Sequence, residues 1–177
     1  MTIDGFIARN DGQMDWMTFN WSEDLNEYVT QLTDPVDTIL LGRRLAEGFI
    51  PHWTAALNQP EPERGAAKMV HTPKVVFSRE LTASKWDNTI IANGNLADEV
   101  NALKKQPGSD MIVYGGGEFV SSLIREKLID ELNLFINPVA IGKGMPIFQE
   151  IADKQNFKPV ASKQFECGII VLTYNLI

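Results

Sequence analysis

Short apolar runs alternate with amphipathic helical patterns along most of the chain, and this alternation constrains the fold more strongly than any other feature. Several of the runs are apolar without interruption, which is typical of strands buried on both faces by crossover helices. The predicted strands in this part of the chain span residues 37–42, 73–78, 89–93, 110–115 and 132–139. Such an alternation predicts an α/β domain built around parallel strands.

The C-terminal part of the chain has a different pattern. Two β-rich runs, 157–166 and 168–176, are joined tightly through Cys167 and Gly168, which predicts an antiparallel hairpin. The expected fold class is therefore α/β with three layers: a mixed, mainly parallel central sheet flanked by helices, with an antiparallel C-terminal hairpin at its edge.

Three helices are predicted from their caps and their apolar spacing. The first has Ser22 as its N-cap and ends at Asp34, before Pro35. The second ends at Pro107, and the third follows a run of glycines. Their apolar faces are formed in turn by Leu25, Tyr28, Val29 and Leu32, by Leu96, Val100 and Leu103, and by Phe119, Val120, Leu123, Ile124 and Leu128. The stretch from residue 51 to 73 is the least regular, and we expect a loop with a short helix there.

Composition limits the possible partners. A length of 177 residues is enough for one domain with a sizeable core, so we expect a single domain over 1–177. The net charge of −7 argues against nucleic acid or an anionic membrane as partner. Cys167 is the only cysteine, and the N-terminal sequence lacks a signal-peptide pattern. His52 and His71 are isolated, so no metal site is proposed. These features predict a small cytoplasmic protein.

The stretch DMIVYGGGEFV runs from a predicted strand through Gly115, Gly116 and Gly117 into a predicted helix. Free N–H groups and the positive end of a helix dipole make such a turn a natural site for an anion, usually a phosphate. A tight turn without a ligand is the alternative. Val120 stands where the G-x-G-x-x-G motif needs glycine, and no G-K-[ST] follows, so neither a Rossmann motif nor a P-loop is predicted.

Two other predicted strands end in residues that suit phosphate groups. One ends in Gly42-Arg43-Arg44 and another in Ser78-Arg79. Because the carboxyl ends of parallel strands share one edge, where ligands bind, these residues are expected beside the glycine turn. Each arginine taken alone could equally be a solvated surface charge. Their coincidence at strand ends favours two phosphate sites, which is what a dinucleotide with an extra ribose phosphate requires.

Five motifs together resemble those of the dihydrofolate-reductase-like superfamily, and they occur in the same order. They are TIDGFIARNDGQMDW, ILLGRR, VVFSR, VYGGGEFV and LIDELNLFINPVAIGKGMPIF. They are most similar to the branch that shares the C-terminal reductase domain of the bifunctional riboflavin-biosynthesis deaminase/reductase. The resemblance covers nearly the whole chain. It implies a dihydrofolate-reductase-like fold, an oxidoreductase activity and NADPH as the hydride donor.

The resemblance also implies which residues bind NADPH. The pyrophosphate would meet Gly115, Gly116, Gly117, Glu118, Phe119 and Val120, and the phosphates would also meet Gly42, Arg43 and Arg44. The adenosine 2′-phosphate would be held by Ser78 and Arg79, and the nicotinamide would pack beside Ile7 and Ala8. A cis peptide bond is expected between the first two of the three glycines, as in other members of the superfamily.

In folate reduction, a carboxylate on the first helix binds the pterin and supports its protonation. The resemblance makes Asp24 the candidate for this catalytic role, with Glu23 and Asp15 as rivals. Alternatively, Asp24 only interacts with the helix N-terminus.

Four further residues are candidates for binding the substrate. Asp4 lies in the IDGF motif, where an ordinary Asp-Gly turn is the alternative. Trp16, Trp21 and Trp53 could line a pocket for a flat heterocycle, or could pack in the core.

The leading functional hypothesis is an NADPH-dependent reductase of a pterin- or pyrimidine-like heterocycle, as in folate reduction or riboflavin biosynthesis. A nucleotide- or flavin-binding protein without reductase activity is one alternative. A structural dimer module with an empty glycine turn is another. At the family level, we also expect a homodimer formed through the C-terminal strands.

Overall fold

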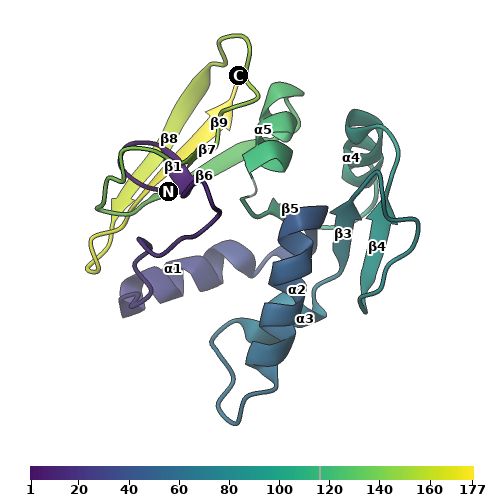
Figure 1. Ribbon diagram of the computed structural model, residues 1–177, viewed down its shortest axis with the longest axis horizontal. Coiled ribbons are helices and arrows are strands. Elements are labelled where there is room, and N and C mark those ends of the chain that lie inside the picture. Colours follow the sequence, from purple (N-terminus) through teal and green to yellow (C-terminus); the bar gives the residue numbers. More distant parts are fainter. Residues whose placement is uncertain (116) are drawn as a thin grey trace. The chain divides into compact units, whose positions relative to one another are not determined.

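The computed structural model describes residues 1–115 and 117–177. Their contacts divide the chain into two compact units, each considered by itself below. One unit comprises Thr30–Gly116, and the other joins Met1–Val29 to Gly117–Ile177. Figure 1 labels the helices and strands of both units.

The first of these units is built on a four-stranded sheet in the order β4-β3-β2-β5. The strands are β2 (Val36–Gly42), β3 (Lys74–Phe77), β4 (Thr89–Ala92) and β5 (Asp110–Val113). All neighbours are parallel, and the register pairs Gly42 with Phe77 and Phe77 with Ala92. Three strands therefore end level with one another at one edge of the sheet.

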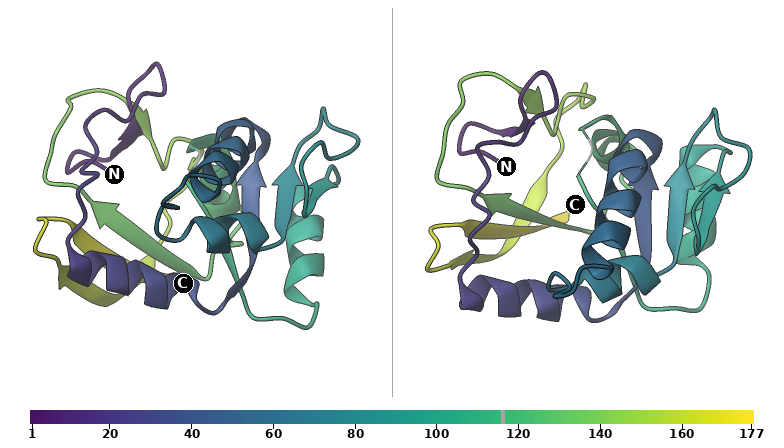
Figure 2. Two further views of the ribbon diagram at one scale, coloured as in Figure 1. Left: turned by 90° about the horizontal axis from the view of Figure 1, so that it is seen from below. Right: turned by 60° about the horizontal axis from the view of Figure 1, so that its bottom comes forward.

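Helices cover both faces of this sheet. They are α2 (Arg43–Leu57), α3 (Ala66–His71) and α4 (Leu96–Lys104). In Figures 1 and 2, α2 and α3 lie together on one side of the strands and α4 lies on the other. Ile39 and Leu41 pack in one cluster with Ala46 and Ile50 of α2. Leu40, which alternates with them, is also buried. The uninterrupted apolar strand thus has both faces covered.

The second unit contains an antiparallel sheet in the order β6-β9-β8. Its strands are β6 (Glu131–Ile136), β8 (Phe157–Gln164) and β9 (Ile170–Leu176), and a short pair is formed by β1 (Phe6–Ala8) and β7 (Met145–Pro146). Helix α1 (Glu23–Thr33) packs Leu25 against Phe165 and Ile169 near the β8–β9 turn. Helix α5 (Gly117–Arg125) buries Leu123 and Ile124.

The fold class predicted from the sequence is confirmed, since helices flank parallel strands and the C-terminal strands are antiparallel. The parallel and antiparallel strands belong to separate hydrogen-bonded sheets. None of the helices in the described part of the chain has the length and apolarity needed to cross a membrane.

A loop was expected from residue 51, but it begins only at residue 58. Helix α2 continues to Leu57 and contains Pro51 in its interior. The proline lies on the exposed side of the helix, while Ile50 and Ala56 are buried. Burial of the apolar face outweighs the hydrogen bond that proline removes. The short helix expected in this stretch is α3, and strands β1 and β7 were not predicted.

Candidate functional site

Three of the segments predicted to bind phosphate lie at the carboxyl edge of the parallel sheet. Gly42 is the last residue of β2, Ser78 directly follows β3, and Tyr114 and Gly115 follow β5. Because β3 and β5 both pair with β2 in parallel, these segments emerge at the same edge. The edge is one where ligands bind in open α/β sheets.

Helix α2 begins at this edge with its N-terminus open. Gly42 is the N-cap residue, its backbone is extended, and as a glycine it supplies no side-chain cap. The first turn contains no acidic residue. Its N–H groups and the positive end of the helix dipole therefore favour an anion at this point.

Arg43 opens helix α2 and contacts two carboxylates. Its guanidinium donates to Glu47 Oε1 at 3.1 Å and to Glu80 Oε1 at 2.9 Å. The hydrogen bond to Glu47 and the charge of Glu80 raise the pKa of Arg43. Both acids were missed in the sequence, although the spacing of four residues between Arg43 and Glu47 is a recognised helix ion pair. The neighbouring Arg44 is exposed, as is Arg79 after β3.

Ser78 is 9% exposed and organises the turn after β3. Its hydroxyl oxygen accepts the N–H groups of Glu80 at 3.1 Å and Leu81 at 3.0 Å. A hydroxyl that accepts two hydrogen bonds can still donate its own proton. Ser78 therefore fixes the position of Glu80 and retains a donor for a ligand.

The glycines of this turn differ in how closely other atoms surround them. Gly115 is exposed, and a Cβ placed on it would meet no atom of the described residues within 4 Å. A Cβ on Gly117 would lie 3.3 Å from Gln149 Nε2 and 3.5 Å from Ile7 Cδ1. Gly116, and with it the predicted cis peptide bond, lies outside the described residues. A side chain at 117 would therefore need a small shift of Gln149, whereas among the described residues nothing around Gly115 excludes one.

The other predicted cofactor residues lie in the second unit. Val120 is 4% exposed, so its side chain packs inside the protein, while Glu118 is exposed and Phe119 is half-buried. Ile7 and Ala8 belong to β1, and Ala8 is buried. A Cβ on Gly144 would collide with the carbonyl oxygen of Ala8, which shows how closely the backbone following the 141–142 turn approaches β1.

Asp4, a predicted substrate ligand, binds a backbone turn in this structure. Its carboxylate accepts the N–H groups of Ile141 at 3.1 Å and Gly142 at 2.7 Å. A hydrogen bond from Thr2, followed by these backbone bonds, holds the pKa of Asp4 below its usual value. The carboxylate is therefore ionised at neutral pH and stabilises the 141–142 turn.

Asp24, the predicted catalytic carboxylate, connects α1 to the β8–β9 turn. Its Oδ1 accepts from the Ser22 hydroxyl at 2.5 Å and from its neighbour Leu25 N–H at 2.8 Å, and its Oδ2 accepts from Glu166 N–H at 3.2 Å. The Ser22 bond is the largest of the effects that lower the pKa of Asp24. A general acid working near pH 7 needs the opposite shift. Asp15, a rival candidate, is paired with Arg9 at 2.6 Å.

The three predicted substrate tryptophans are divided between the units. Trp16 is half-buried, and its buried indole N–H has no hydrogen-bond partner among the described residues. The Trp21 indole donates to Thr18 O at 2.9 Å. Trp53 lies on α2 and packs against Phe49, with ring centroids 6.1 Å apart. It therefore belongs to the unit that contains the parallel sheet.

Comparison with known sequences assigns most of the chain to one family model. The model described as the RibD C-terminal domain matches residues 1–171. The Bacillus subtilis protein YyaP, described as uncharacterized, is 36% identical over 180 residues, which cover 99% of this chain and 90% of YyaP.

Two solved structures show the same fold. The deaminase/5-amino-6-(5-phosphoribosylamino)uracil reductase of Thermotoga maritima gives a TM-score of 0.71 at 19% identity, over 99% of this chain and 54% of that one. Dihydrofolate reductase from Enterococcus faecalis, complexed with NADP(H) and RAB-propyl, gives a TM-score of 0.59 at 16% identity, over 99% of this chain and 92% of that one. At these identities the likeness concerns the fold alone.

Proposed function

The chain belongs to the RibD C-terminal domain family, and on that basis we propose that it is an NADPH-dependent reductase of a pterin- or pyrimidine-like heterocycle. The Thermotoga protein carries a uracil reductase in its name, and the Enterococcus enzyme was solved with NADP(H). NADPH, when bound, would supply the hydride. The residues of this chain would bind and orient it and exclude water from the reacting atoms.

One observation supports the proposal more strongly than the others do. The open N-terminus of α2 lies at the same sheet edge as Arg43, Arg44 and the Ser78-Arg79 pair. The helix N-terminus suits the pyrophosphate, and a serine with an arginine suits a ribose 2′-phosphate. The residues present therefore fit NADPH better than NADH.

The test is a comparison of the two cofactors with an Arg79→Ala variant. We expect this change to weaken NADPH binding by roughly tenfold or more, because a charge-assisted hydrogen bond to the 2′-phosphate is lost. NADH has no 2′-phosphate, so its binding should be nearly unchanged. Fluorescence titration measures both constants. Arg125→Ala, at the far end of α5, is the matched control for loss of a surface arginine. Equal loss for NADPH and NADH would refute the 2′-phosphate assignment.

A nucleotide- or flavin-binding protein without reductase activity is the second candidate. The lowered pKa of Asp24 favours it, because that carboxylate is a poor proton donor at neutral pH. NADPH oxidation should be followed with dihydrofolate and with 5-amino-6-(5-phosphoribosylamino)uracil. Binding of NADPH without turnover of either compound would support the second candidate.

The remaining partners are proposed on the same family basis. We expect a small heterocyclic substrate, a homodimer formed through the β6-β9-β8 sheet, a cytoplasmic location, and no nucleic-acid or membrane partner. Light scattering coupled to size-exclusion chromatography gives the mass in solution. A monomer at micromolar concentration would contradict the dimer.

A further inference from the structure

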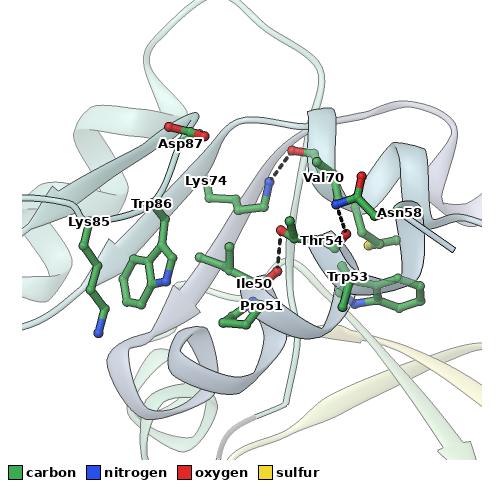
Figure 3. Close-up of a pocket in the computed structure, with 12 residues that line it drawn as sticks. Ile50, Pro51, Trp53, Thr54, Asn58, Val70, Lys74, Lys85, Trp86 and Asp87 are labelled. Carbon is green, nitrogen blue, oxygen red and sulfur yellow. Dashed lines mark hydrogen bonds between the residues drawn. The ribbon is translucent and has the colours of Figure 1, made fainter.

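A cavity of about 480 Å³ lies at the opposite, amino-terminal edge of the parallel sheet (Figure 3). Its lining comes from the second half of α2, from α3, from the first residue of β3 and from the segment before β4. Lys74 and Thr89, which begin their strands, are register partners at this edge. The cavity is therefore separate from the candidate NADPH site at the carboxyl edge.

Lys74 is a buried cation that lines the cavity. The residue is 3% exposed, and its ammonium donates to the backbone carbonyls of Val70 at 2.8 Å and Thr72 at 2.7 Å. Within residues 1–115 and 117–177, no carboxylate lies within ion-pair distance of it. An ammonium has three N–H donors, so one remains for a further acceptor. Burial lowers the pKa of Lys74, as expected where no opposite charge compensates the ammonium.

Two indoles belong to the lining of the cavity, Trp53 on α2 and Trp86 in the segment before β4. In Figure 3, Trp86 and Trp53 lie on either side of Ile50 and Thr54, with Lys74 above them. Ile50 is also buried in the core cluster of this unit. The Thr54 hydroxyl is already bonded to Ile50 O at 2.8 Å. The Lys85 ammonium lies 5.0 Å from the centroid of the Trp86 ring. The walls therefore combine flat apolar surface with indole N–H groups and a second ammonium.

The charges of the lining select the charge of a ligand. Lys74 and Lys85 contribute two positive charges and Asp87 contributes one negative charge, which leaves a net charge of about one positive. A phosphate dianion would bring a second negative charge close to Asp87. A carboxylate, with one charge, matches both the net charge and the donor.

We propose that this cavity binds a small aromatic carboxylate, with a carboxylate oxygen accepting the third N–H of Lys74 and the ring packed against Trp53 and Trp86. Pairing compensates the buried charge, and the ring buries apolar indole surface. A purely structural lysine that only holds the last turn of α3 is the alternative that the test must separate.

The test compares naphthalene-2-carboxylate with its neutral analogue, naphthalene-2-carboxamide, on the full chain without NADPH. Calorimetry at pH 7.5 gives both affinities. We expect the acid to bind the wild-type protein roughly tenfold or more tightly than the amide. Lys74→Met keeps the apolar stem and should remove this preference, whereas Lys105→Met, an exposed lysine of the same unit, should retain it.

A second variant keeps the test informative if Lys74→Met fails to fold, which circular dichroism would show. Trp86→Leu should weaken the acid and the amide alike, because it removes ring contact and leaves the ammonium in place. Equal affinity of acid and amide, no binding of the acid, or competition by inorganic phosphate as strong as that by the acid would each overturn the proposal.

Discussion

Arg43 is a cation at a candidate phosphate site, and two carboxylates already hold it. Glu47 lies on its own helix, whereas Glu80 reaches it from the turn after β3 and is 71% exposed. An exposed ion pair contributes little to stability, so an incoming phosphate can replace Glu80 at small cost. An anion that binds Arg43 at this edge of the sheet must therefore compete with these two carboxylates.

A Glu80→Gln variant tests this competition. Removing the carboxylate leaves Arg43 more available, and we expect NADPH binding to tighten by roughly two- to fivefold. Glu61→Gln, which removes an exposed carboxylate elsewhere in the same unit, is the matched control and should leave NADPH binding unchanged. Weaker NADPH binding by the Glu80 variant would mean that this carboxylate orients Arg43 rather than competing with the phosphate.

Gly144 illustrates a different constraint on a single residue, because the backbone of β1 leaves no room for a side chain there. We expect Gly144→Ala to lower the free energy of unfolding by about 1–3 kcal/mol through overpacking. Urea denaturation measures the change. In Gly48→Ala, on α2, the new methyl group meets nothing within 4 Å, so that control should leave stability unchanged or slightly raised. Similar results for the two variants would contradict this explanation.

At the scale of elements, Asp24 ties helix α1 to the hairpin of β8 and β9. The hydrogen bond from Glu166 N–H joins residues 142 positions apart. Neighbouring Ser22 also accepts the N–H of Cys167 at 3.2 Å, so helix and turn are linked twice. The apolar contact of Leu25 with Phe165 and Ile169 lies beside these bonds. Polar and apolar contacts therefore act on the same junction.

We expect Asp24→Ala to lower the melting temperature through this junction. The folded-state pKa of Asp24 is lowered from 3.8, so its stabilisation is present above pH 3.8 and is lost as the pH falls through the lowered value. Melting curves of wild type and variant should therefore converge in acid. Asp24→Asn, which keeps an acceptor oxygen, should restore part of the loss. A variant that melts like wild type but has lost turnover would instead favour the catalytic role.

Local pattern was enough to predict most elements, because caps, breakers and apolar periodicity act over a few residues. Helix α1 begins directly after the predicted N-cap Ser22, and each predicted strand is present. Helix α2 was not predicted as a whole because a proline such as Pro51 usually ends a helix. Its tolerance depends on which side of the helix faces Met69 and the sheet, and this is a tertiary property.

At the scale of the whole molecule, the parallel sheet offers two edges with different chemistry. Helix α2 begins at the carboxyl edge with Arg43 and ends beside the cavity that contains Lys74. Arginines at the first edge are exposed or paired with acids, whereas the lysine at the second is buried among carbonyls. We expect the first edge to bind a dinucleotide and the second a monoanion.

A thermal scan tests the dinucleotide site on the complete chain. NADPH at about 100 times its Kd should raise the free energy of unfolding by about 2.7 kcal/mol, and NADH at the same concentration should raise it less. Calorimetry also tests the prediction of a single domain, which requires one cooperative transition over 1–177. Two separate transitions would contradict the prediction of a single domain. An unchanged melting temperature in the presence of NADPH would contradict the prediction that the chain binds NADPH.

The sequence alone determined the order of the seven longer strands and of helices α1, α4 and α5, and it identified residues at strand ends that suit phosphate, since these features depend on near neighbours. Only the tertiary structure placed Gly42 level with Phe77, tied Asp24 to the hairpin, and buried Lys74 with no carboxylate partner among the described residues. The reason is physical. Burial and charge pairing depend on residues that are distant in the chain, and no local pattern records which of them the fold brings together.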